Sequence, residues 1–572
     1  ITLVAVFFPI VFMDGTTGRL FREFSIVVSG SVIISSFAAL TFTPMLATKL
    51  LIKREQQSWF YRKTEPFFEG MNRVYSQSLA AFLKRRWIAL PFTIVTILLI
   101  GVLWNTIPAE MAPLEDRSQI SINTMGAEGV TYEYIRDYTE DINHLVDSII
   151  PDAEAVTARV SSGSGNVRIT LKDMKDRDYT QMEVAEKLSK AVQKKTMARS
   201  FVQQSSSFGG RRGGMPVQYV LQATNIEKLQ EVLPKFMTKV YENPVFQMAD
   251  VNLKFSKPEA RININRDKAS IMGVSTKNIA QTLQYGLSGQ RMGYFYMNGK
   301  QYEILGEINR QQRNKPADLK GIYIRSDNGN MVQLDNLIEL TGGIAPPKLY
   351  RYNRFVSATI SAGLADGKTI GQGLDEMDKI AKETLDETFR TALTGDSKEY
   401  RESSSSLMFA FILAIVLIYL ILAAQFESFK DPLIIMLTVP LAIAGALVFM
   451  YFGGITMNIF SQIGIIMLIG LVAKNGILIV EFANQKQEAG EDKMRAIKDA
   501  SLQRLRPILM TSASTILGLI PLAYATGEGC NQRIAMGTAV VGGMLISTLL
   551  TMYIVPAIYS YVSTNRSKLK TE

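Results

Sequence analysis

The sequence has almost none of the residues that build metal centres and disulfides. Cysteine and histidine each occur once in 572 residues, as Cys530 and His144. A single cysteine excludes a disulfide framework or a cysteine-built metal site within the chain, and a single histidine excludes paired-histidine metal chemistry. Neither an HExxH motif nor a nucleophile elbow is present. The sequence therefore predicts no metal site, no cofactor and no catalytic residues, and we do not expect an enzyme.

Charge is also nearly missing from several long stretches. The composition of the whole chain does not reveal these stretches, because 47% apolar and 20% charged residues would suit a soluble protein. A helix needs about 20 apolar residues to cross the hydrocarbon core of a membrane. Seven runs reach that length, and residues 1–13 have the composition of half a further span. The seven runs are Phe24–Leu51, Trp87–Ile107, Leu407–Gln425, Pro432–Phe452, Met457–Phe482, Pro507–Thr526 and Ile534–Val562.

The basic residues between these runs predict how the chain crosses the membrane. If the spans alternate strictly, nineteen Lys and Arg residues fall on one side in short loops and tails, and three fall on the other. Basic loops stay in the cytoplasm, so the large block Pro108–Ser406 is expected outside it. The net charge of +10 then reflects topology, and we expect no nucleic-acid partner. The stretch Trp59–Phe82 has the pattern of an amphipathic helix on the inner membrane surface.

The last two spans repeat the first two. A shift of 512 residues aligns them without a gap, so that Pro9 meets Pro521 and Pro44 meets Pro556. The same proline spacing in both copies indicates a duplicated protein with parallel repeats. Because the chain opens with Ile1 and half a span, we expect four further spans, and a second external domain, to precede it in a longer protein.

The external block alternates predicted strands and helices. Its first part has the order β-α-β-β-α-β, typical of a ferredoxin-like unit, and a second unit of this kind is interrupted by an insert at about Glu259–Lys348. The first unit comprises strand Gln119–Met125, helix Tyr134–Ile149, hairpin Ala155–Leu171, helix Gln181–Ala198 and strand Phe201–Ser205. The second comprises Val217–Leu221, Ile226–Tyr241, Ala249–Phe255, Val356–Ala362 and Ile370–Thr388. The predicted fold class is an α-helical membrane bundle with an α+β external domain.

One lysine lies inside an apolar run. Lys474 is placed in IGLVAKNGILIVEF, where a charge costs about 2.5–3.5 kcal/mol on insertion scales. Such a residue usually pairs with an acid in the bundle interior, and we expect that acid on the spans that precede this chain. The alternative is a lysine that snorkels or braces helix packing. Asn475 and Thr511 are candidates for the same relay, although hydroxyls in membrane helices also bond their own helix.

The hairpin Ala155–Leu171 predicts a polar surface beside the Gly-rich loop Ser205–Pro216. Alternation places its apolar residues on one face and its polar residues on the other. A cleft edged with arginines attracts carboxylates, sulfates or phosphates, so the hairpin and loop predict a site for anionic or zwitterionic molecules. The alternative is that the arginines only pair with acids on the second external domain that is expected to precede this chain. The candidate cleft residues are Thr157, Arg159, Arg168, Phe208, Arg211 and Arg212.

A loop that resembles a phosphate-binding motif carries no prediction. Gly363–Thr369 reads GLADGKT, which is one residue short of the P-loop pattern. It also lies on the side of the membrane without ATP, so we expect no nucleotide site.

Three runs of the sequence carry a family resemblance. AKNGILIVEFANQ (Ala473–Gln485), RLRPILMTSASTILGLIPLA (Arg504–Ala523) and AAQFESFKDPLIIMLTVPLAIAGAL (Ala423–Leu447) resemble the resistance-nodulation-division (RND) efflux pumps of the hydrophobe/amphiphile type. The resemblance implies a homotrimer in the Gram-negative inner membrane that exports amphiphilic compounds in exchange for protons. It implies a periplasmic adaptor and an outer-membrane channel as partners. Lys474 and Thr511 match the family's relay residues.

The resemblance also assigns the parts of the chain. Residues 1–51 would hold the last two spans of the first repeat, 52–86 the surface segment, 87–107 a span, 108–406 the periplasmic porter domain with its docking insert, 407–562 five spans and 563–572 a cytoplasmic tail. The hairpin departs from the family, because its loop reads SSGSGN and polar residues stand where aromatic ones are expected.

Two other functions compete with proton-driven export. A non-transporting scaffold or receptor of the same superfamily would have no need of a buried lysine. Metal-ion efflux would need a methionine cluster, and Ala155–Lys172 contains no methionine.

Overall fold

The computed structural model describes residues 2–13, 15–50, 59–204, 215–345, 348–365 and 367–564. The chain forms two compact units. The main unit comprises Ile1–Met125, Ile135–Asn252 and Arg351–Glu572, and the insert unit comprises Gly126–Tyr134 and Leu253–Tyr350. Each unit is described below by itself.

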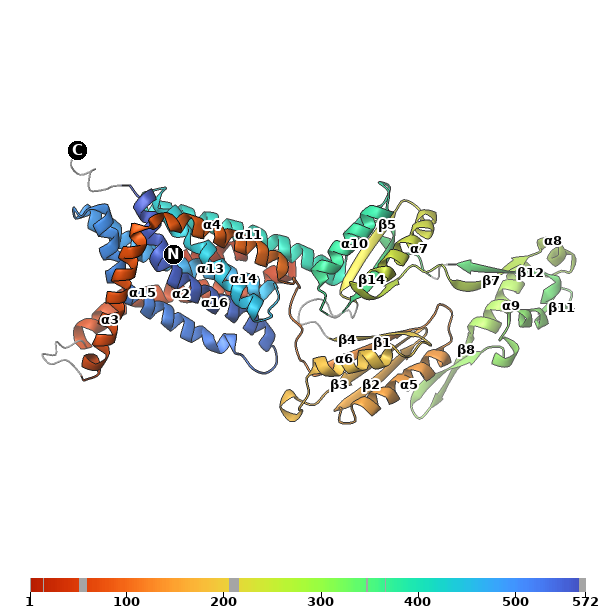
Figure 1. Ribbon diagram of the computed structural model, residues 1–572. Coiled ribbons are helices and arrows are strands. Elements are labelled where there is room, and N and C mark those ends of the chain that lie inside the picture. Colours follow the sequence, from red (N-terminus) through yellow and green to blue (C-terminus); the bar gives the residue numbers. More distant parts are fainter. Residues whose placement is uncertain are drawn as a thin grey trace. The chain divides into compact units, whose positions relative to one another are not determined.

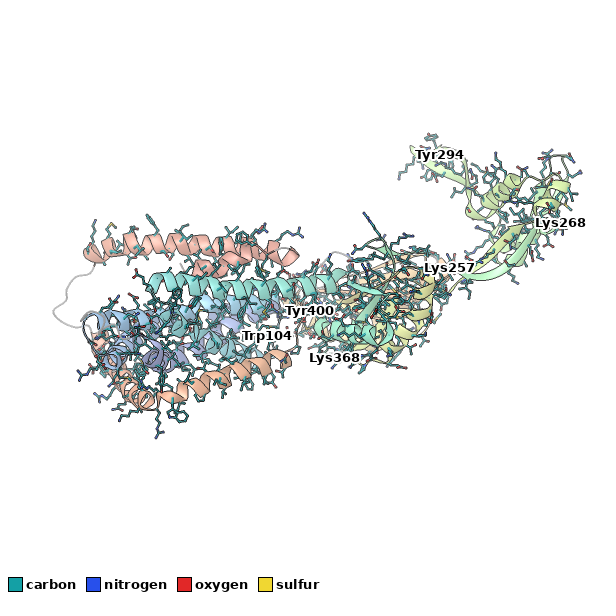
Figure 2. The ribbon with its side chains drawn as sticks, turned by 90° about the horizontal axis from the view of Figure 1, so that it is seen from above. Trp104, Lys257, Lys268, Tyr294, Lys368 and Tyr400 are labelled. Carbon is teal, nitrogen blue, oxygen red and sulfur yellow. The ribbon has the colours of Figure 1, made fainter. Side chains whose placement is uncertain are left out.

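Long apolar helices of the main unit lie side by side in a bundle (Figures 1 and 2). Within the described ranges, seven helical segments are long and apolar enough to cross a membrane, and the shorter α1 is also apolar. The helices of the bundle are α1 (Thr2–Val11), α2 (Gly15–Leu50), α4 (Ala89–Thr106), α11 (Gly395–Phe426), α12 (Asp431–Met436), α13 (Thr438–Phe452), α14 (Ile459–Glu488), α15 (Lys493–Ala523) and α16 (Cys530–Val562).

Several of these helices differ from the expected runs, and α2 and α15 begin before them, at Gly15 and Lys493. The run Pro432–Phe452 is divided into α12 and α13 at Leu437, because Pro440 has no N–H to continue the helical ladder across the junction. Helix α11 begins at Gly395, well before the apolar run. Its first turn is anchored by Ser397, whose Oγ accepts a hydrogen bond from Gln218 N at 2.8 Å and donates to Pro216 O. Figure 2 labels Tyr400 in this first part of α11.

Helix α3 (Trp59–Lys84) packs across α15 and α16. Its buried face includes Leu79 and Tyr75, whose hydroxyl donates to Met552 O at 2.6 Å. Glu65 pairs with Arg506 of α15 at 2.9 Å. One face of this helix is therefore bound to the bundle, and Trp59 and Phe67 stay exposed on it.

The first sheet module of the main unit contains four strands and two helices in the order β1-α5-β2-β3-α6-β4. The antiparallel strands lie in the order β2-β3-β1-β4. The helices cover one face, where Ile120, Val167 and Ile169 pack against them. The elements are β1 (Gln119–Met125), α5 (Tyr132–Ile149), β2 (Ala155–Ser161), β3 (Ser164–Thr170), α6 (Gln181–Val192) and β4 (Arg199–Gln204).

Three expectations for this module need correction. The hairpin loop is only Ser162–Gly163, because Gly163 takes a φ of 83° and lets Ser161 pair with Ser164. Helix α6 ends at Val192, before the polar run that starts at Gln193. Ala158 was expected on the packed face but is exposed, because β2 is the edge strand of the sheet.

The second sheet module repeats this arrangement as β5-α7-β6, then β14-α10-β15. Its strands lie in the order β6-β14-β5-β15, with β13 (Arg351–Tyr352) also pairing with β14. The expected strand Ala249–Phe255 instead covers earlier residues, since the chain leaves the sheet after Asn252. The elements are β5 (Val217–Ala223), α7 (Ile226–Glu242), β6 (Phe246–Val251), β14 (Phe355–Leu364), α10 (Ile370–Thr384) and β15 (Arg390–Leu393). Strand β15 was not expected from the sequence.

The insert unit is built from strand pairs around a small apolar core. Strand β7 (Lys257–Ile264) pairs with β12 (Ile338–Ala345), and β8 (Gln290–Met297) pairs with β9 (Lys300–Gly306). The core contains Ile279 of α9 (Thr276–Ser288), with Val274, Leu334 and Leu337. Figure 2 labels Lys257, Lys268 and Tyr294 in this unit. Short elements complete it: α8 (Arg266–Ile271), β10 (Tyr323–Arg325) and β11 (Met331–Gln333).

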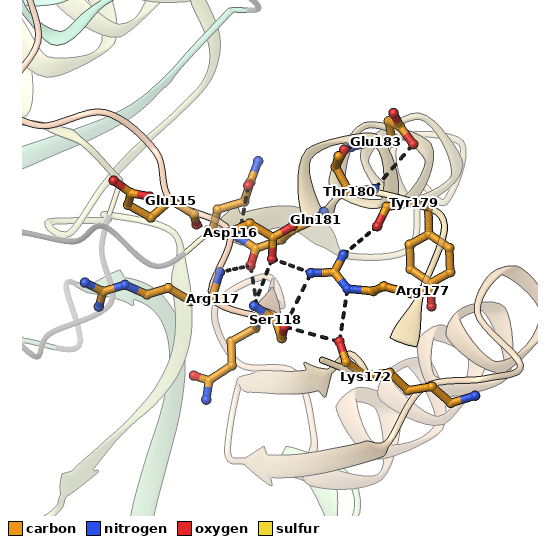
Figure 3. Close-up of polar contacts among 12 residues, drawn as sticks. Glu115, Asp116, Arg117, Ser118, Lys172, Arg177, Tyr179, Thr180, Gln181 and Glu183 are labelled. Carbon is orange, nitrogen blue, oxygen red and sulfur yellow. Dashed lines mark hydrogen bonds and ion pairs between the residues drawn. The ribbon is translucent and has the colours of Figure 1, made fainter. Parts of the chain in front are cut away.

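A buried ion pair holds the entry of the first sheet module (Figure 3). Asp116 contacts the guanidinium of Arg177, whose side chain is fully buried. The same guanidinium donates to Lys172 O at 3.0 Å and to Tyr179 O at 2.8 Å. Asp116 also accepts from Gln181 N at 2.8 Å. The carboxylate and the guanidinium are therefore hydrogen-bonded on several sides, as buried charges require.

We predict that Arg177→Met destabilises the first sheet module by about 3–5 kcal/mol, because Asp116 is left buried without its counter-charge. Hydrogen exchange of β1 and α6 should quicken accordingly. The matched control is Arg117→Met, since Arg117 is exposed, and it should leave exchange unchanged. Equal exchange in both variants would contradict this account.

Candidate functional site

Helix α16 approaches α13 and α14 closely at two glycines. A Cβ on Gly543 would lie 2.5 Å from Leu468 of α14 and 2.8 Å from the backbone oxygen of Ala442 of α13. A Cβ on Gly542 would lie 2.4 Å from Phe449. Small residues permit such close packing between membrane helices. The polar residues that follow in α16 are thereby brought within reach of α14 and α15.

Three helices place a polar cluster in the apolar bundle. Asn475 of α14 is fully buried, and its Nδ2 donates to Ser512 Oγ of α15 at 3.3 Å and to Thr548 Oγ1 of α16 at 3.5 Å. Thr548 in turn donates to Ser512 at 3.2 Å. Asn475 Oδ1 and Thr551 Oγ1 are buried and have no partner among the described residues. The cluster thus contains one acceptor, Asn475 Oδ1, that has no donor among the described residues, and Thr551 lies three residues after Thr548 on α16.

Lys474 lies beside this cluster near the middle of α14. Its side chain is half-buried, and no residue in the described ranges forms an ion pair or hydrogen bond with its ammonium group. Glu481, seven residues further on, accepts a hydrogen bond from Gln485 at 3.0 Å. The expected acid partner is therefore not supplied by the described part of this chain.

Thr511 is not one of the three hydrogen-bonded residues. Its Oγ1 donates to Ile508 O of its own helix at 3.2 Å, which is the local bonding common for hydroxyls in membrane helices. The neighbouring Ser512 points into the cluster instead. Of the expected relay residues, the structure joins Asn475 to other polar groups and leaves Thr511 on its own helix.

A second polar network crosses the bundle about three helical turns from Lys474 along α14. Asn484 donates to Asp431 Oδ2 of α12 at 3.1 Å and accepts from the Tyr559 hydroxyl of α16 at 2.6 Å. Gln487 donates to the same hydroxyl at 2.6 Å. All four side chains are buried. The network binds α12, α14 and α16 together at the end opposite to the sheet modules.

The two sheet modules enclose a cleft of about 610 Å³. It is lined by polar side chains and by the apolar Phe201, Met125 and Met215. Of its two charged residues, Asp250 pairs with Arg199 at 3.3 Å, whereas Arg159 has no ion-pair or hydrogen-bond partner in the described ranges. The remaining lining residues are Asn123, Thr124, Ser161, Ser164, Gly165, Asn166, Gln218, Asn252 and Ser361.

The expected cleft residues divide into three groups. Arg159 lines the cleft. Thr157 and Arg168 pair with each other across β2 and β3 and are exposed, but they are not among its lining residues. Phe208, Arg211 and Arg212 lie outside the described residues.

Sequence reasoning missed Thr548 and Phe201 as site residues, and it favoured Thr511 over Ser512 as the hydroxyl of the relay. Ser512 adjoins Thr511, and only the rotation of α15 decides which of the two faces Asn475. Thr548 follows the Gly542–Gly543 pair, which was a usable signal for a close helix contact. Phe201 belongs to β4, whose pairing with β1 places it opposite Asn123; that register was not visible in the sequence.

Comparison with known proteins decides the family. The family model described as AcrB/AcrD/AcrF matches residues 1–563. The chain belongs to the AcrB/AcrD/AcrF family of RND transporters. An uncharacterized transporter from Haemophilus influenzae is 31% identical over 579 aligned residues, which cover 100% of this chain and 56% of that protein. This AcrB/AcrD/AcrF family chain therefore spans about half the length of the relative that it matches.

The helix contact that builds the cluster in this AcrB/AcrD/AcrF family member gives a stability prediction. Gly543→Ala should cost about 1–3 kcal/mol, because its Cβ would overlap Leu468 and the α13 backbone. Gly518→Ala in α15 is the matched control, since a Cβ there meets nothing within 4 Å and alanine favours helix. Thermal melting in detergent should separate the two variants, and coincident melting curves would argue against the close contact.

Proposed function

We propose that this chain is part of a proton-driven antiporter that exports amphiphilic compounds from the Gram-negative inner membrane. It would act as a homotrimer with a periplasmic adaptor and an outer-membrane channel. The two sheet modules would serve as ferredoxin-like porter subdomains and the insert unit as a docking subdomain. The observation that carries the proposal is Lys474, a half-buried lysine beside a polar cluster in a helix bundle whose core is mainly apolar.

The chemistry of this lysine supports coupling to protons. A charge held within an apolar bundle needs a counter-charge, and the described residues do not provide one. The partner acid would lie in the part of the longer protein that this chain does not cover. When that acid takes up a proton, the ammonium loses its partner and turns toward other polar groups. Asn475 follows Lys474 in the sequence, and its Oδ1 is a buried acceptor that has no donor among the described residues.

The alternatives are less consistent with these sites. A scaffold or receptor would have no use for a lysine that costs insertion energy. Metal-ion efflux gains some support from Met125 and Met215 in the cleft. However, Arg159 in the same lining would repel a metal cation, so amphiphile export remains the function we propose.

The first functional prediction is that Lys474→Met abolishes proton-coupled export by the complete protein, because the charge pair that responds to protonation is lost. Expression and assembly should be unchanged. Thr511→Ala should weaken export less, since water can replace a hydroxyl in part. Proton flux in proteoliposomes measures the effect, with Lys49→Met, an exposed lysine at the end of α2, as control. Undiminished export by Lys474→Met would refute the relay.

The cleft supports a preference for anionic substrates. The Asp250 charge is compensated by Arg199, so the guanidinium of Arg159 leaves the lining with a positive charge. Guanidinium groups bind carboxylates, sulfates and phosphates through paired hydrogen bonds. Phe201, Met125 and Met215 offer apolar surface for the rest of such a molecule. We therefore propose bile-acid-like or fatty-acid-like compounds ahead of cationic drugs.

The second functional prediction separates two arginines of the same hairpin. Arg159→Gln should impair efflux of anionic amphiphiles by about ten-fold, the loss expected when one charge-assisted contact worth about 1.5 kcal/mol is removed. Efflux of cations such as ethidium should not fall. Arg168→Gln is the matched control, because Arg168 is exposed but does not line the cleft. Equal losses for anions and cations would show that charge in the cleft does not select substrates.

A further inference from the structure

The segment between α4 and β1 is bound to two membrane helices at once. We call residues 107–118 the strap. Met457 N donates to Pro108 O at 2.8 Å, Glu110 N donates to Met457 O at 3.0 Å, and Ile459 N donates to Met111 O at 3.2 Å. The hydroxyl of Thr456 also contacts the Glu110 carboxylate. These bonds attach the first half of the strap to the start of α14.

The second half of the strap holds the start of α16. Glu115 Oε1 accepts from Gln532 N at 2.9 Å, and its Oε2 accepts from Asn531 N at 3.4 Å. The Asn531 side chain returns a bond to Leu114 O at 2.7 Å. The first amides of a helix have no partner within the helix and carry partial positive charge. A carboxylate that is 1% exposed is thus satisfied by the helix terminus.

The residue after Glu115 is Asp116, which belongs to the buried ion pair at the entry of the first sheet module. Asp116 contacts Arg177, and Gln181, which is fully buried, accepts from Arg117 N at 2.9 Å and from Gln119 N at 3.1 Å. Figure 3 shows Glu115, Asp116 and Gln181 along this short path. The strap is therefore hydrogen-bonded continuously from the start of α16 to the start of β1.

Helices α14 and α16 are also the helices that carry Asn475 and Thr548. Any shift of α16 along α14 that rearranges the polar cluster must move Asn531 and Gln532. We propose that the strap transmits rearrangement of the membrane cluster to the first sheet module, with Glu115 as the positioning residue that joins α16 to it. This inference rests on the proposed proton-driven function for its purpose, and on the contacts above for its path. Coupling through a continuous series of hydrogen bonds can be tested by removing one of them, here the bonds of Glu115 to α16.

The first arm of the test measures transport by the complete protein in proteoliposomes. Glu115→Ala removes both acceptors and should lower substrate-stimulated proton flux by roughly 5- to 150-fold, the range typical of coupling between linked sites. Substrate binding should be retained, because Glu115 does not line the cleft. Glu115→Gln keeps one acceptor oxygen and should give an intermediate loss. Glu140→Ala is the control, since Glu140 is exposed on α5.

The second arm measures coupling without any transport. In the otherwise unchanged protein, Lys474→Met should alter hydrogen exchange at Asn531, Gln532 and the strap. In the Glu115→Gln background the same change should reach the strap and β1 only in part, because one of the two acceptor oxygens remains. If hydrogen exchange responds in this way while the unaltered protein shows no proton flux, transmission through the strap is supported and the proposed proton-driven function is refuted.

Two results would refute transmission through the strap. Normal substrate-stimulated flux in Glu115→Ala, or an exchange response of undiminished size in Glu115→Gln, would show that the bonds to α16 are only structural. If Glu115→Ala does not fold, the Glu115→Gln measurements decide the question by themselves.

Discussion

The close approach of α16 to α13 and α14 is the constraint on which the rest of the main unit depends. It is possible only because Gly542 and Gly543 have no side chain at the contact. This contact sets the depth of Thr548 beside Asn475 and the position of Tyr559 beside Asn484. It also fixes where the first amides of α16 meet Glu115. One backbone contact therefore positions two polar networks and the joint with the sheet modules.

The periodicity of the sequence identified helices and strands, but it did not show which of them are in contact. The long apolar runs and the alternation in β1 and β3 are local, so they could be recognised without knowing any neighbour. Lys474 and Asn475 also stood out locally, because polar residues are conspicuous in an apolar run. Ser512 and Thr548 could not be assigned, since their partners depend on the rotation and depth of three packed helices. Helix α11 was placed too short, because its first turns are polar and are held by Ser397.

The cleft shows the same limit in β structure. Alternation correctly separated Arg159 from the packed face of the hairpin, yet it treated Arg159 and Arg168 as equivalent. Their difference arises from register, because Arg159 lies opposite Asn166 near the hairpin turn and Arg168 lies two pairs away, opposite Thr157. Phe201 reaches the lining through a strand that follows a helix. Contacts that arise from the pairing of strands cannot be predicted from the sequence of one segment alone.

Hydrogen bonding differs between the polar groups at the ends of α16 and those near its middle. Each polar side chain in the network of Asp431, Asn484 and Tyr559 has a partner, as does the Glu115 carboxylate. Breaking such groups apart would leave buried polar atoms unpaired at a cost of about 1–3 kcal/mol each. The cluster around Asn475 differs, because Asn475 Oδ1 and Thr551 Oγ1 already lack partners among the described residues. The polar groups at both ends of α16 are therefore hydrogen-bonded, whereas the cluster between them holds an acceptor without a donor among the described residues. The proposed coupling would begin at this cluster, because a new donor to Asn475 Oδ1 would offset part of the cost of breaking its present bonds.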